Sequence, residues 1–130
     1  MEHYFTNYSG NCFVSEASKI KGYMKVGLER YVYDTETGIK VDKTFDDSFT
    51  DVSFIPENLP LDLIQKIKQA LPLIVRFTVA SPIYKNKEDY ALRVNEVGTL
   101  TYDVNVRIVS YEEKNGFFNG EVLDSTVKFN

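Results

Sequence analysis

Hydrophobic and polar residues alternate along several stretches of the chain. The longest stretch runs from Leu100 to Ile108, where every second residue is apolar and the residues between them are polar. A period of two is typical of β-strands that bury one face. Shorter stretches of this kind lie at residues 26–33, 39–45, 49–55, 75–79, 90–94 and 121–129. The pattern predicts a mainly β protein of about seven strands.

The predicted strand from residue 26 to residue 33 differs between its two faces. Three aliphatic residues share one side, and Glu29, Tyr31 and Tyr33 lie on the other. The segment Asp34–Gly38 follows, and its glycine can adopt a positive φ, so we expect a hairpin turn there. Tyr31 and Tyr33 are therefore expected to face solvent.

The period changes between Leu59 and Leu71. Apolar residues stand at positions 60, 63, 64, 67 and 71, which form one stripe of an amphipathic helix. We expect Asn58 to cap this helix at its start and Pro72 to end it.

These elements predict one domain over residues 1–130. The expected architecture is a small β-barrel with a single helix, at about residues 59–71, inserted before the C-terminal strands. A helix between the third and fourth strands is the arrangement of the oligonucleotide-binding (OB) fold, so the order of the elements predicts an OB-like barrel.

Composition excludes several classes of function. The single Cys12 excludes a disulfide framework and a cysteine-rich zinc site, and the lone His3 makes a histidine metal cluster or a catalytic triad implausible. Cys12 lies in the apolar segment 11–14, where we expect a buried, unreactive thiol. No long apolar run and no secretory leader pattern occur, so we expect no membrane partner and a cytoplasmic location.

The net charge of −4 is unevenly distributed along the chain. Residues 34–62 carry eight acidic and two basic side chains, whereas residues 63–93 carry six basic and two acidic ones. An acidic protein therefore contains a basic segment, and its net charge does not exclude a nucleic-acid partner.

Two clusters, at residues 19–33 and 76–93, combine basic and aromatic side chains. Single-stranded nucleic acid is bound by this mixture because cations neutralise phosphates and aromatic rings stack on bases, at about 1–3 kcal/mol per base. We expect Arg76 and Arg93 to lie side by side on adjacent strands. The alternative is that the tyrosines cover a second side of the sheet and the lysines only solvate it. The predicted binding residues are Lys25, Arg30, Tyr31, Tyr33, Arg76, Tyr84, Lys85, Lys87, Tyr90 and Arg93.

A third of the chain resembles a known family. The segments Leu63–Lys68, Ile74–Val79, Tyr84–Lys87 and Tyr90–Val94 form a pattern of helix, basic strand, basic loop and aromatic strand. This pattern resembles the C-terminal half of phage-type single-stranded DNA-binding proteins with an OB-fold. The resemblance implies sequence-tolerant binding of single-stranded DNA in phage replication or recombination. It further implies a homo-oligomer such as a dimer, replication or recombination proteins as partners, and the host cytoplasm as location.

A nuclease is a rival interpretation. The segment Tyr31–Gly38 resembles the first motif of the DEDD exonucleases, in which Asp34 and Glu36 would hold metal ions. That chemistry needs two further aspartates, the last preceded at four residues by Tyr or His, and no Tyr or His here has Asp at that offset. We therefore predict no catalytic residues, no metal site, no cofactor and no enzymatic activity.

A protein-binding module is the second hypothesis. The acidic stretch from Asp34 to Asp62 could attract a basic partner, as expected for a small acidic phage protein that engages a host or virion protein. The acidic side chains lack the spacing of a calcium loop, so a solvated acidic surface is their simplest interpretation.

Overall fold

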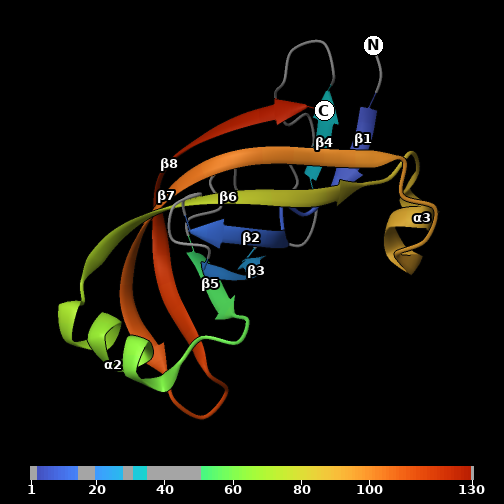
Figure 1. Cartoon of the computed structure of the whole chain (residues 1–130). Coiled ribbons are helices and arrows are strands. Elements are labelled where there is room, and N and C mark those ends of the chain that lie inside the picture. Colours follow the sequence, from blue (N-terminus) through green and yellow to red (C-terminus); the bar gives the residue numbers. More distant parts are fainter. Residues whose placement is uncertain (1–2, 15–19, 28–30, 35–50, 130) are drawn as a thin grey trace.

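A closed antiparallel β-barrel forms the body of the protein. The computed structural model describes residues 3–14, 20–27, 31–34 and 51–129. Six strands follow one another around the barrel in the order β2-β3-β5-β8-β7-β6 (Figure 1). Their bounds are β2 Gly10–Val14, β3 Ile20–Val26, β5 Asp51–Pro56, β6 Leu73–Ile83, β7 Gly98–Glu112 and β8 Phe117–Phe129. The predicted mainly β architecture is confirmed.

A second, two-stranded sheet lies outside the barrel. It pairs β1 (His3–Thr6) with β4 (Tyr31–Asp34) in antiparallel register. Backbone hydrogen bonds between Phe5 and Tyr84 connect β1 to the segment that follows β6. This small sheet therefore lies at the end of the barrel where β6 ends (Figure 1).

The position of β7 between β6 and β8 explains the strongest sequence pattern. Along β7, the apolar residues between Leu100 and Ile108 are all buried, and the residues between them are half-buried or exposed. The register places Phe77 of β6 opposite Val104, and Tyr102 opposite Val79. The alternation of the sequence is therefore the alternation between the inside and the outside of the barrel.

Aromatic rings fill the interior of the barrel. Phe54 contacts both Phe77 and Phe118, with ring centroids 4.9 and 6.4 Å apart. The Tyr102 hydroxyl is buried and donates a hydrogen bond to the backbone carbonyl of Tyr8. Burial of these large side chains is the main favourable term for the fold.

The predicted helix is present as α2 (Leu61–Ala70). Its half-buried Ile64 and Ile67 pack against the barrel core. The predicted cap is wrong, because Pro60 occupies the N-cap position and no side chain caps the helix. No helix in the described parts of the chain is long and apolar enough to cross a membrane.

The predicted strand at residues 90–94 is wrong. Residues Lys87–Leu92 form a short helix, α3, and Arg93 ends it in the left-handed conformation with a φ of 56°. Asn86 caps α3 by accepting a hydrogen bond from the Asp89 backbone N–H at 2.8 Å. Alternation over five residues does not distinguish a strand from one and a half helical turns, whereas the cap decides for the helix.

Two predicted strand boundaries also differ. The predicted strand at residues 26–33 is split, because β3 ends at Val26 and β4 begins at Tyr31. The predicted strand at residues 75–79 is longer, because β6 runs from Leu73 through Pro82 to Ile83. The pairing of β2 with β6 stops at Ala80, so a proline beyond it disrupts no ladder with β2. The predicted turn after Asp34 and the returning strand at residues 39–45 lie outside the described residues.

The closure of the barrel between β2 and β6 yields a stability prediction. A Cβ atom at Gly10 would lie 2.0 Å from the backbone oxygen of Ala80. We expect Gly10→Ala to lower the free energy of unfolding by about 2–3 kcal/mol, as overpacking does. Urea denaturation measures this loss. The matched control is Gly27→Ala, whose Cβ would be 3.3 Å from its nearest neighbour, and equal losses in both variants would contradict the close approach.

Cys12 yields a prediction on thiol reactivity. Cys12 is 5% exposed, as predicted, and burial raises the pKa of its thiol to about 12. A free cysteine has a pKa of about 8.5, so the unfolded chain carries a substantial share of thiolate at pH 8 and mostly thiolate at pH 10, whereas the buried thiol stays protonated at both. We expect iodoacetamide to leave the folded protein unmodified at pH 8 and at pH 10. Urea-unfolded protein is expected to react completely at both pH values, and similar rates in both states would refute a buried thiol.

Candidate nucleic-acid interface

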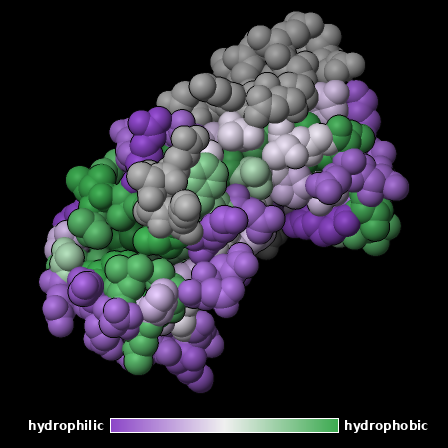
Figure 2. Space-filling view, in the orientation of Figure 1, coloured by the Kyte–Doolittle hydropathy of each residue, from purple (hydrophilic) through white to green (hydrophobic). Residues whose placement is uncertain are grey.

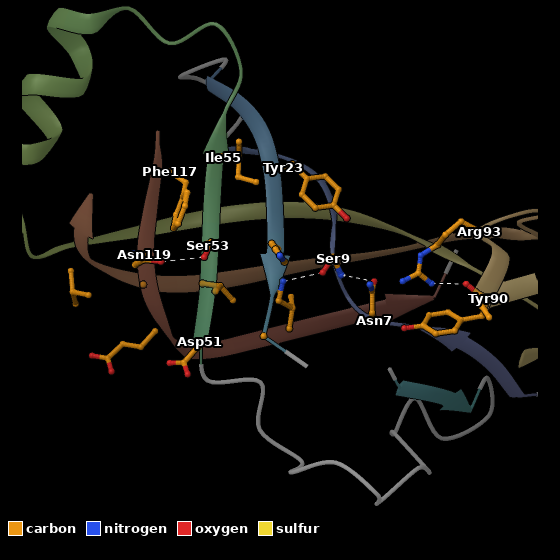
Figure 3. A pocket seen from close by; sticks show the side chains of 18 residues that line it. Asn7, Ser9, Tyr23, Asp51, Ser53, Ile55, Tyr90, Arg93, Phe117 and Asn119 are labelled. Atoms are coloured by element: carbon orange, nitrogen blue, oxygen red, sulfur yellow. Dashed lines mark hydrogen bonds between the residues drawn. The ribbon is translucent and has the colours of Figure 1, made fainter. Parts of the chain in front are cut away.

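A groove of about 1410 Å³ crosses the outside of the barrel. Its floor consists of the outer faces of β3, β5 and β8, as Figure 3 shows. At one end, Asn7 and Ser9 from the turn between β1 and β2 and Arg93 from the end of α3 approach the floor. The volume exceeds the range of about 300–1,000 Å³ that is typical of small-molecule pockets, so the groove suits an extended ligand.

Strand register arranges the floor in rows. Tyr23 of β3 pairs with Ile55 of β5, and Phe117 of β8 follows in the same row beyond Ile55. This aromatic row presents Tyr23 with 40% of its surface exposed and Ile55 with 39%. Two flat rings flanking an aliphatic side chain form an apolar surface on which planar groups can stack.

The next row is polar. Lys25 of β3 pairs with Ser53 of β5, which pairs with Asn119 of β8. The Ser53 hydroxyl donates a hydrogen bond to Asn119 Oδ1 over 3.2 Å. A third row, two residues further along the strands, places Asp51 opposite Glu121.

Ser9 attaches the rim of the groove to its floor. Its Oγ accepts a hydrogen bond of 2.9 Å from the backbone N–H of Val26, and its own N–H donates to Asn7 Oδ1 over 3.0 Å. Ser9 is 3% exposed, so the Val26 N–H has this hydroxyl as its partner in a place closed to water. The turn that carries Asn7 is thereby held beside β3.

Arg93 is held at the mouth of the groove by Tyr90. The Arg93 guanidinium lies 4.2 Å from the centroid of the Tyr90 ring, and its Nη1 donates to the Tyr90 carbonyl over 2.6 Å. Tyr90 itself is 8% exposed. The ring therefore supports the cation rather than offering a free face to a base.

The charges along the groove are asymmetric. Lys25 lies in the row of Ser53, and Arg93 lies at the rim formed by α3, whereas Asp51 and Glu121 form the third row. The Glu121 carboxylate forms a surface salt bridge of 2.9 Å with Arg107, which partly neutralises it. An anionic chain would be attracted to the cations Lys25 and Arg93 and repelled from the acidic row.

Of the ten predicted binding residues, three line this groove, namely Lys25, Tyr90 and Arg93. Arg76 lies elsewhere, on the outer face of β6, where it forms a 3.0 Å salt bridge with Asp103. The predicted neighbourhood of Arg76 and Arg93 on adjacent strands is wrong, because Arg93 ends a helix and Arg76 pairs with Asn105 of β7.

The loop before α3 does not contribute to the groove. Tyr84 is 5% exposed, so its ring is not available for stacking. Burial is also the main cause that raises the pKa of its hydroxyl. The Lys85 ammonium lies 4.7 Å from the centroid of the Tyr4 ring, and Lys87 is exposed at the start of α3. Figure 2 shows both hydrophilic and hydrophobic surface where α3 lies. The sequence places acidic Glu88 and Asp89 next to the two lysines.

The remaining predictions fall on β4 or outside the described residues. Tyr31 and Tyr33 lie on β4, which pairs with Thr6 and Tyr4 rather than with the barrel. Arg30 lies outside the described residues. Asp34 of the nuclease motif pairs with His3 in the same small sheet, and Glu36 is again outside the described residues. Among the side chains the structure describes, no group of three or more His, Cys, Asp or Glu residues could hold a metal ion.

Sequence reasoning missed most of the groove floor. Tyr23 belongs to the first basic and aromatic cluster and alternates with buried Gly22 and Met24, so its outward position was detectable. Phe117 and Asn119 follow the Asn115–Gly116 turn, where nothing in the sequence indicates that β8 lies next to β5. Only the pairing of these distant strands brings the two residues beside Tyr23 and Ser53.

Comparison with known proteins adds no assignment to this geometry. No protein-family model, no curated protein and no solved structure matches the chain. The functional argument therefore rests on the groove itself.

The rim of the groove yields a prediction. Ser9→Ala removes the acceptor of the buried Val26 N–H, and an unsatisfied buried donor costs about 1–3 kcal/mol. We expect that loss in the free energy of unfolding, measured by urea denaturation. Ser110→Ala changes an exposed serine of β7 and is expected to change stability by less than about 0.5 kcal/mol. An unchanged Ser9→Ala protein would show that the hydroxyl is not needed.

Proposed function

We propose that this chain binds single-stranded DNA, without strict sequence preference, along the groove on β3, β5 and β8. The observation that carries the proposal is the exposed Tyr23 ring, with Lys25 two residues along the same strand and Phe117 in the same row across Ile55. Aromatic rings stack on any base, and a neighbouring cation binds the phosphate between two bases.

The chemistry of each group follows from its position. Tyr23 and Phe117 stack on successive bases, whereas Lys25 and the immobilised Arg93 guanidinium neutralise phosphates. The acidic row, Asp51 and Glu121, limits the bound strand to the other two rows of the floor. The groove is therefore expected to use few phosphate contacts and to depend mainly on stacking.

The OB-like interpretation of the barrel belongs to this proposal. In favour of it, α2 lies between the third and fourth strands of the barrel, and the groove lies on the second and third of them, which form the binding face of OB-folds. The barrel here has six strands instead of five, so the relation is one of arrangement. We further propose a binding protein rather than an enzyme, acting in phage replication or recombination in the cytoplasm as a homo-oligomer.

An oligonucleotide titration tests the proposal. We expect fluorescein-labelled oligo-dT of about 12 nucleotides to bind, with anisotropy as the measurement. Tyr23→Ala is expected to weaken binding by about 5- to 140-fold, the equivalent of one lost stacking contact of about 1–3 kcal/mol. Lys25→Ala is expected to weaken it and to reduce the salt dependence between about 50 and 200 mM, because two groove cations give a slope near −1.4 and one gives about −0.7.

The control for both variants is Lys85→Ala, which removes an exposed cation outside the groove and is expected to bind as the wild type does. Absence of binding to the wild type at low salt would reject the proposal. Loss of binding in Lys85→Ala but not in Lys25→Ala would place the binding face near α3 instead.

A peptide is the second candidate ligand. The acidic Asp51 and Glu121 share the groove with the apolar Ile55 and Phe117, so the groove would accept a basic and apolar segment of a partner protein. Asp51 belongs to the acidic stretch whose remaining members mostly lie outside the described residues. Charge-reversing Asp51→Lys separates the candidates, because it would strengthen DNA binding and abolish binding of such a peptide.

A further inference from the structure

A hydrogen-bonded pair of polar side chains lies in the middle of the groove floor. Ser53 and Asn119 are direct neighbours on β5 and β8, and both are half-buried (Figure 3). The Ser53 Oγ donates to Asn119 Oδ1 over 3.2 Å. The row containing this pair lies directly beside the aromatic row of Tyr23, Ile55 and Phe117.

This hydrogen bond orients the Asn119 amide. A side-chain amide has an acceptor oxygen on one side and two N–H donors on the other. Because Oδ1 faces Ser53, the Nδ2 group faces away from Ser53, and no hydrogen bond within the described part of the chain uses it. Asn119 therefore offers donors to a ligand on the floor of the groove.

The third side chain of this row, Lys25, is also a donor. Lys25 lies on the far side of Ser53, and its ammonium group has three N–H donors and no acceptor. The nearest carboxylate on β5, Asp51, stands two residues away, a distance of about 7 Å along the strand. A base stacked on the aromatic row of Tyr23 thus meets the donors of Asn119 and Lys25 in the second row. The acceptor carboxylates of Asp51 and Glu121 belong to the third row.

The bases differ in what they present to such donors. Thymine and uracil have the acceptor O4 where cytosine has the donor N4 amino group, and guanine has O6 where adenine has an amino group. An amino group placed against Asn119 Nδ2 leaves two donors facing each other without an acceptor, which is unfavourable in a partly closed site.

We propose that the groove selects keto bases (thymine, uracil and guanine) over the amino bases cytosine and adenine. Asn119 is the selecting residue, and Ser53 is the positioning residue that orients its amide. This inference rests on the proposed binding of single strands in the groove. It adds a base preference to a site whose stacking rings do not distinguish between bases.

Two oligonucleotides of equal length, oligo-dU and oligo-dC, provide the test. Their bases differ at position 4, keto in uracil and amino in cytosine, and at the adjacent N3, which carries a proton only in uracil. A difference in affinity therefore reports on this edge of the base and on strand flexibility. We expect the wild type to bind oligo-dU about 10-fold more tightly, which corresponds to 1.4 kcal/mol or one well-placed base contact. Fluorescence anisotropy measures both affinities under the same salt conditions.

Two variants separate base selection from strand flexibility. Ser53→Ala frees the Asn119 amide to rotate, so the ratio of the two affinities is expected to fall to about 2 or less while oligo-dC binds at least as well as before. Asn119→Asp replaces donors with acceptors, so the ratio is expected to reverse, although the added negative charge weakens both affinities. Asn115→Asp introduces the same charge in the β7–β8 turn outside the groove and is expected to retain the wild-type ratio.

Each outcome has a distinct meaning. If the wild type binds neither oligonucleotide, the proposed function itself is rejected. If it binds both equally, the function stands and base selection is wrong. If Ser53→Ala and Asn119→Asp both retain the wild-type ratio, the preference arises from the strand and the inference is overturned. Asn119→Asp decides the question if Ser53→Ala fails to fold.

Discussion

The closure of the barrel depends on a backbone contact without side chains. Gly10 of β2 lies so close to Ala80 and Ser81 of β6 that any Cβ would overlap the backbone of its neighbour. Gly22 of β3 lies equally close to Ile55 of β5, and its Cβ would be 2.3 Å from the Ile55 oxygen. Where two strands bend this tightly around a narrow interior, only glycine leaves enough space.

Closure in turn determines which side chains form the groove. Once β3, β5 and β8 are neighbours, strict alternation sends Met24, Phe54 and Phe118 into the core and the residues beside them outward. A slip of one residue in this register would exchange the core with the groove floor. The stability of the aromatic core therefore also maintains the spacing between Tyr23 and Asn119.

A short helix contributes the other side of the groove. The Asn86 cap starts α3, and the left-handed conformation of Arg93 ends it after six residues. This turn directs the Arg93 guanidinium back over the Tyr90 ring. Had residues 90–94 formed a strand, Tyr90 and Arg93 would point to opposite faces, and the cation would lack its aromatic support.

The sequence by itself determined the elements whose signals are local. The alternation from Leu100 to Ile108, the helical stripe before Leu71 and the apolar surroundings of Cys12 each reflect burial of one face of one segment. A short alternating segment such as 90–94 fits more than one period, so this local signal led to the wrong element there.

Tertiary structure alone decided which distant strands became neighbours. The pairing of β5 with β8 brings together residues 66 positions apart, such as Ser53 and Asn119, and no local pattern encodes that distance. The tertiary structure also buries Tyr84 and separates Arg76 from Arg93. The physical reason is that a binding surface forms from contacts between strands, whereas the sequence pattern reports only on the faces of each strand by itself.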